Sequence, residues 1–96
     1  MVNWGNVKTL KNTMKESINL FTLHSFKELP EERDSITSKI VVVLEGTINI
    51  YRQVGPAKNK TVLLVGQSSK IPAGCWYELT NTADEDARFL IIDHEV

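Results

Sequence analysis

The stretch Ile71-Pro72-Ala73-Gly74-Cys75-Trp76-Tyr77-Glu78-Leu79-Thr80-Asn81 says the most about how this chain folds. Pro72 fixes the backbone φ angle where one strand ends, and Gly74 allows the backbone to double back. Asn81 can hold a neighbouring turn through its side-chain amide. The stretch therefore predicts a sharp corner followed by a strand that turns alternate side chains inward: Cys75, Tyr77 and Leu79.

Other segments of the chain also have the short apolar pattern of strands. Residues 40–50 predict two strands joined at Gly46. Counted along the whole chain, the predicted strands are 18–26, 39–44, 47–53, 61–65, 76–81 and 88–93, separated by turns or loops at 29–34, 54–60, 66–69 and 82–86. Six or more short strands with turn signals about every 8–12 residues are typical of an all-β sandwich or small barrel.

The 96 residues predict one domain over 1–96, with an N-terminal arm at 1–17 and a barrel at 18–93. Residues 6–16 fit a helix, a loose arm or a short strand. A net charge of -1 argues against a nucleic-acid-binding surface. No apolar run reaches the roughly 20 residues that span a bilayer. The polar start and the single Cys75 favour a cytoplasmic protein.

The spacing of Gly66, Pro72, Gly74 and Asn81 matches the second motif of the cupin superfamily, Gly-x5-Pro-x-Gly-x-x-His-x-x-x-Asn. Gly46 fits the last residue of the first cupin motif, Gly-x5-His-x-His-x3,4-Glu-x6-Gly. Over residues 33–93 the chain thus resembles a cupin, and this resemblance implies a double-stranded β-helix, or jelly-roll, barrel.

The resemblance does not extend to the residues with which cupins bind a metal. Tyr77 stands at the position of a metal-binding His. The other ligand positions fall approximately on Arg33 or Glu32, on Ser35 or Asp34, and on Lys39. Lysine and arginine side chains offer no lone pair to a cation at neutral pH. We therefore expect the barrel without a metal or other cofactor. His24, which could point inward, and Cys75, a possible nucleophile, complete the set of candidate site residues.

Three functions are compatible with such a barrel. The favoured one is binding of a small organic ligand, anionic because of Arg33 and Lys39, or sugar-like. The second is a metal-independent isomerase, epimerase or lyase in which Tyr77 and Lys39 transfer protons. The third is a structural or protein-binding jelly roll, in which Tyr77 and Cys75 fill the core and Lys39 reaches the barrel mouth or pairs with Glu32 or Asp34.

Two further resemblances lead to other functions. Residues 71–81 are similar to a stretch of nucleotide-sugar ketoisomerases of the cupin class, which use a pair of histidines that this chain lacks. The Glu45-Gly46 pair between two strands also occurs in cyclic-nucleotide-binding domains, but no phosphate-binding cassette accompanies it here.

The strand at 39–44 also predicts a partner. After Lys39 it is apolar at every position, so that both of its faces need cover. In a two-layered barrel only one face meets the core, and we therefore expect a homodimer that covers the other. Trp76, which should point outward, is a second candidate for such a contact.

Overall fold

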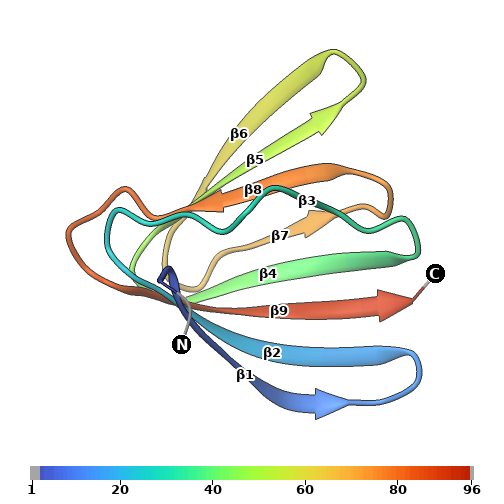
Figure 1. The fold of residues 1–96 in the computed structure, drawn as a ribbon, viewed down its shortest axis with the longest axis horizontal. Coiled ribbons are helices and arrows are strands. Elements are labelled where there is room, and N and C mark those ends of the chain that lie inside the picture. Colours follow the sequence, from blue (N-terminus) through green and yellow to red (C-terminus); the bar gives the residue numbers. More distant parts are fainter. Residues whose placement is uncertain (1–2, 96) are drawn as a thin grey trace.

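The computed structural model describes residues 3–95, which form nine β-strands and no helix (Figure 1). Within this range there is accordingly no helix long and apolar enough to cross a membrane. The strands, in chain order, are β1 (Gly5–Asn12), β2 (Glu16–Leu23), β3 (Glu32–Arg33), β4 (Thr37–Glu45), β5 (Ile48–Val54), β6 (Ala57–Leu63), β7 (Ser68–Ile71), β8 (Trp76–Thr80) and β9 (Ala87–Glu95).

The strands form two antiparallel sheets that face each other. One sheet has the order β1-β2-β9-β4-β7 and the other has the order β3-β8-β5-β6. Consecutive strands repeatedly change sheet, as in a jelly roll, so the predicted all-β jelly-roll fold is confirmed. The inward positions of both sheets supply the core, whose largest fully buried apolar side chains are Phe89, Leu23, Ile48, Ile50, Ile71 and Leu79.

The N-terminal segment is a strand and not a helix or a loose arm. β1 pairs with β2 from Gly5 opposite Leu23 to Asn12 opposite Ser17, with an irregularity between Thr9 and Lys11. The boundary expected after residue 17 falls inside β2. Residues 1, 2 and 96 of the expected domain lie outside the described residues.

Three expected turns or loops contain strand pairing that the sequence pattern missed. The turn predicted at 54–60 is wrong except at Gly55 and Pro56, because β5 and β6 pair as far as Val54 opposite Ala57. The loop predicted at 29–34 contains β3, which pairs with β8. The turn at 66–69 already includes the start of β7, which pairs with β4. These segments are short and polar, so their strand character comes from the neighbouring strand.

The glycines at the two predicted corners do adopt a backbone conformation that other residues avoid. Gly46 has φ +76° and Gly74 has φ +83°. At Gly46 space is also restricted, since an added Cβ would lie 3.0 Å from the Asp86 carbonyl oxygen. The expected role of Asn81 is likewise confirmed: its amide donates to the carbonyl oxygens of Leu23, His24 and Glu85.

β4 has the two apolar faces that its sequence predicted. Val41 and Val43 point inward and are fully buried, whereas Ile40 and Leu44 point outward and are 41% and 45% exposed. Nothing in the described chain covers this outer face.

Candidate functional site

A cavity of about 340 Å³ opens between the sheets, where the inner faces of β2, β4 and β9 meet β8 and the segment at 29–32. We call it the inner cavity. Its polar lining includes Lys39, Tyr77, Asp93 and Glu32, and its aromatic lining includes Trp4 and Phe21. Its volume falls in the range of small-molecule sites, which starts at about 300 Å³.

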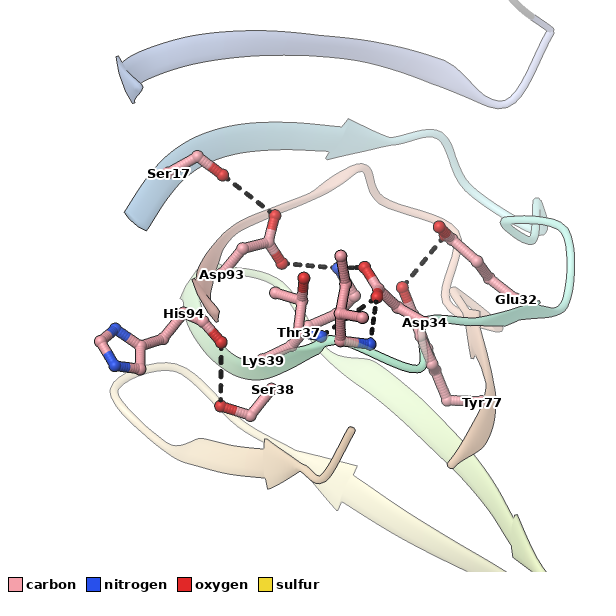
Figure 2. Close-up of polar contacts among 10 residues, drawn as sticks. Ser17, Glu32, Asp34, Thr37, Ser38, Lys39, Tyr77, Asp93 and His94 are labelled. Atoms are coloured by element: carbon pink, nitrogen blue, oxygen red, sulfur yellow. Dashed lines mark hydrogen bonds and ion pairs between the residues drawn. The ribbon is translucent and has the colours of Figure 1, made fainter. Parts of the chain in front are cut away.

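Lys39 lies on the inner face of β4 and is only 7% exposed. Its Nζ lies 2.6 Å from Asp93 Oδ1 on β9 and 3.8 Å from Asp34 Oδ2, which confirms the expected pair with Asp34. Ser17 Oγ on β2 donates to the other oxygen of Asp93 at 3.1 Å. Figure 2 shows these side chains converging from three strands and the loop before β4. The lysine amine is therefore fixed in position and not mobile at the surface.

Asp34 is held by the backbone that follows it. Its Oδ1 accepts hydrogen bonds from the amides of Ile36 at 3.0 Å and Thr37 at 3.1 Å (Figure 2). Partial burial acts to raise the pKa of Asp34. The amide of Ile36, a hydrogen bond from the Thr37 side chain, the Lys39 charge and the amide of Thr37 outweigh it, and the pKa is lowered. Asp34 is thus a stable anion beside Lys39.

Tyr77 projects inward from β8 and is 5% exposed, as the alternation of that strand predicted. Its hydroxyl donates to Glu32 Oε2 at 3.1 Å (Figure 2). Burial raises the pKa of Tyr77 most, and the charge and hydrogen bond of Glu32 raise it further. Tyr77 consequently keeps its proton throughout the neutral range and acts as a hydrogen-bond donor.

Two aromatic rings, those of Trp4 and Phe21, belong to the apolar wall of the cavity, and a third ring packs behind them. The Trp4 and Phe21 rings are 6.0 Å apart, and Phe21 stacks on Phe89 at 5.4 Å with the planes nearly parallel. Trp4 and Phe21 face the inner cavity, whereas Phe89 is fully buried behind them. The cavity thus combines an aromatic lining with hydrogen-bonding groups.

Of the candidate residues, Lys39 and Tyr77 line the inner cavity, and the others lie elsewhere. Arg33 is exposed, donates to the Gly74 carbonyl oxygen at 3.1 Å and has its guanidinium carbon 6.0 Å from the centre of the Trp76 ring. Ser35 is exposed in the turn before β4.

His24 and Cys75 also lie apart from the cavity lining. His24 Nδ1 lies 3.2 Å from Asp86 Oδ2 at the opposite end of the sandwich. Cys75 is buried, and its Sγ lies 3.3 Å from the carbonyl oxygen of Trp76. Neither side chain lines the inner cavity with Lys39 and Tyr77.

Sequence reasoning missed Asp93 and Trp4 as parts of the site, and it considered Glu32 only as an alternative to Arg33 and as a partner of Lys39. Asp93 had a readable signal, because it is the acidic end of an apolar strand and stands on the same face as Phe89 and Ile91. Trp4 had none, since it enters the cavity only through the pairing of β1 with β2 and its contact with Phe21.

The side chains around the inner cavity do not fit a divalent cation. Over residues 3–95, no group of three or more His, Cys, Asp and Glu side chains is arranged to hold one. Lys39 occupies the centre of the acidic side chains, and its ammonium is a donor without a lone pair. This set of side chains supports hydrogen bonding, with Lys39 and Tyr77 as donors and Asp93 and Glu32 as acceptors.

The sequence matches no protein-family model and no curated protein. Solved structures are nevertheless similar in fold. The cupin domain of Schizosaccharomyces pombe Cnp3 has a TM-score of 0.84 at 14% identity, over 94% of this chain and 64% of that one. Oxalate oxidase in complex with glycolate has a TM-score of 0.87 at 18% identity, over 99% of this chain and 53% of that one.

A cupin superfamily protein of Desulfitobacterium hafniense is also similar, with a TM-score of 0.81 at 17% identity, over 96% of this chain and 78% of that one. The chain therefore has the cupin fold, as its motif spacing predicted. It spans about two thirds of the Cnp3 domain and about half of the oxalate oxidase chain. Since these structures include an enzyme and a domain not named as one, the fold alone does not define an activity.

Proposed function

We propose that this protein binds a small, uncharged polyhydroxyl compound, such as a sugar, in the inner cavity. The observation that carries the proposal is the combination of an enclosed polar cluster with an aromatic wall in one cavity of about 340 Å³. Sugar hydroxyl groups both donate and accept hydrogen bonds, and the C–H face of a sugar ring packs on aromatic rings. The cavity offers a partner for each of these properties.

The charges around the cavity argue against the anionic ligand that Arg33 and Lys39 suggested. Lys39 is already paired with Asp93 and Asp34, and Arg33 does not line the cavity. The lining carries Glu31, Glu32 and Asp93 against one lysine, so an anion would meet an excess of negative charge. A cation would have to compete with Lys39 for Asp93 and with the Tyr77 hydroxyl for Glu32. An uncharged ligand avoids both conflicts.

The protonation of Tyr77 favours binding over acid–base catalysis. A general acid works best when its pKa lies near the working pH, and the pKa of Tyr77 is raised far above it. The Lys39 amine is held by a 2.6 Å ion pair with Asp93 and would have to leave it to act on a substrate. A metal-independent isomerase or lyase remains the second candidate, because Lys39 and Tyr77 do line the same cavity.

A purely structural role for the jelly roll is the third candidate, and it requires a filled interior. The inner cavity argues against it, because its volume exceeds the roughly 300 Å³ at which small-molecule sites begin.

A matched set of ligands tests the proposal. The protein, labelled with ¹⁵N, is titrated with neutral pentoses and hexoses and with an anionic and a cationic sugar, glucuronate and glucosamine. We expect saturable shifts of the amide signals around Lys39 and Tyr77 with at least one neutral sugar, and weaker binding of both charged ones. No saturation with any neutral sugar, or a preference for a charged one, would overturn the proposal.

Variants connect the binding to the site. Lys39→Met and Tyr77→Phe should each weaken the binding of the neutral sugar about 10-fold or more, because each removes a polar group from the cavity lining. Lys60→Met is the matched control, since Lys60 is an exposed lysine on β6 that does not line the cavity. Circular dichroism confirms that each variant is folded. Equal affinities in all three variants would place the binding elsewhere. Turnover of the sugar, followed by NMR, would instead support the isomerase.

A further inference from the structure

The outer face of the five-stranded sheet has an apolar centre. Two rows of residues cross its three middle strands β2, β9 and β4. One row is Ile18, Ile92 and Ile40, and the next is Leu20, Leu90 and Val42. All six residues are aliphatic, and each is at least partly exposed. We call this surface the aliphatic face.

The outer face of the four-stranded sheet has no such rows. Its central row is Glu78, Tyr51 and Lys60, which pair across β8, β5 and β6. The Lys58 and Lys60 amines lie 5.6 Å and 5.9 Å from the centre of the Tyr51 ring. A polar outer face is what a solvent-facing antiparallel sheet normally has. The aliphatic face therefore needs an explanation that the other sheet does not.

We infer that a second copy of this chain covers the aliphatic face, in a symmetric dimer with the two five-stranded sheets packed face to face. Inner faces of sheets pack in this way about 10 Å apart, with aliphatic side chains between them. This inference is independent of the ligand proposed above, because none of the six residues lines the inner cavity.

The charges at the ends of the aliphatic face suit a copy of the same surface. At one end His94 Nδ1 lies 4.0 Å from Glu16, and at the other end Arg88 lies 3.8 Å from Glu45. A two-fold axis running across the strands brings opposite ends together, so that Glu16 of one copy approaches the Arg88 end of the other. Each end offers one acid and one base, and the same surface is complementary to itself, as a two-fold interface requires.

The outer face of the whole five-stranded sheet, with the aliphatic face at its centre, is also large enough for a dimer interface. Strands about 4.8 Å apart with a rise of about 3.4 Å per residue give a five-stranded sheet of this length about 600 Å² of outer face. Two such faces bury about 1,200 Å², which reaches the lower limit of specific interfaces. Lysines on the flanking strands, Lys8 and Lys11 on β1 and Lys70 on β7, make a polar rim around it.

Analytical ultracentrifugation over a concentration series tests the dimer. We expect the wild type to dimerise at micromolar concentration and Ile40→Lys to weaken the dimer at least about 100-fold, since the substitution buries two unpaired amines per interface. The matched control is Val62→Lys, which adds the same charge at a residue of similar exposure, 47% against 41%, on the other sheet. The control should dimerise like the wild type.

A wild-type monomer at the highest concentration would overturn the inference, as would dissociation by Val62→Lys but not by Ile40→Lys. A second variant serves if Ile40→Lys does not fold. Leu90→Cys places a thiol on the central strand of the aliphatic face. The single native cysteine of the chain, Cys75, is buried and should not react. A short bismaleimide, about 10 Å long, spans two sheets packed face to face better than a disulfide does. It should cross-link two Leu90→Cys chains and leave Val62→Cys monomeric under denaturation. Equal cross-linking of both variants would contradict a specific interface.

Discussion

At one end of the interior, β4, β8 and β9 turn Lys39, Tyr77 and Asp93 inward, and at the other end the same three strands turn Val43, Leu79 and Phe89 inward. The first end contains the inner cavity and its hydrogen-bonded side chains, whereas the side chains at the second end are packed and fully buried. Each of these strands thus contributes to the inner cavity and to the core within a few residues. This difference indicates that the packed end stabilises the barrel. The other end can therefore be lined with polar side chains without loss of the fold.

The packed end should have the largest effect on stability. Phe89→Ala removes a fully buried ring that stacks on Phe21, and we expect the free energy of unfolding to fall by about 3–5 kcal/mol. Urea denaturation measures it. Phe26→Ala is the control, because Phe26 is 70% exposed, and it should change the stability by less than about 0.5 kcal/mol. Equal losses in the two variants would mean that the burial of Phe89 does not stabilise the packed end.

Asn81 is the polar counterpart of Phe89 at the packed end. Its amide donates to three carbonyl oxygens and its Oδ1 accepts from the Ala83 amide at 3.0 Å, while it is only 1% exposed. Asn81→Ala leaves these buried groups without partners and should cost about 2–3 kcal/mol. Asn81→Asp keeps the acceptor but loses the donors, so thermal unfolding should show a similar loss. A loss below about 0.5 kcal/mol in both would show that water replaces the amide.

Tyr77 at the hollow end should have the smallest effect at neutral pH. Tyr77→Phe removes one hydrogen bond and should cost about 1 kcal/mol at pH 7. Because the pKa of Tyr77 is raised in the folded state, its proton stays bound above pH 10 while the unfolded tyrosine ionises. The wild type should then lose about 1.4 kcal/mol per pH unit relative to Tyr77→Phe, since the variant lacks this group.

Urea denaturation of both proteins at pH 7 and at several values above 10 measures this difference. The advantage of the wild type should shrink and then reverse as the pH rises. A difference that stays constant across the series would show that Tyr77 ionises as easily in the folded protein as in the unfolded chain.

The local sequence pattern predicted the structure correctly where the geometry of a strand or corner depends only on its own residues. The corner at Gly74, the tie made by Asn81 and the inward position of Tyr77 all followed from residue type and alternation. The short polar strands β3 and β7 did not follow, because strands of two and four residues are held by their partners and carry little pattern of their own. The same limit explains the overlong turn expected around Gly55.

The candidate site was half predicted. Lys39 and Tyr77 occupy cupin ligand positions in the motif spacing, and both line the inner cavity. Arg33 and Ser35 came from the same count, but they fall beside a corner and in a turn, where strand alternation no longer decides the direction of a side chain. Glu32 and Asp93 are 61 residues apart in the chain, and only the packing of two sheets brings them to one cavity.

By itself, the sequence determined the alternation, the glycine corners and the motif spacing, and these are enough to define the cupin fold because each depends on the covalent chain within a few residues. Only the tertiary structure decided which charges meet. The pairing of Lys39 with Asp93, the donation of Tyr77 to Glu32 and the aromatic wall from Trp4 all join distant segments. Electrostatic and hydrogen-bond energies depend on distances of a few ångströms, and folding alone creates those distances.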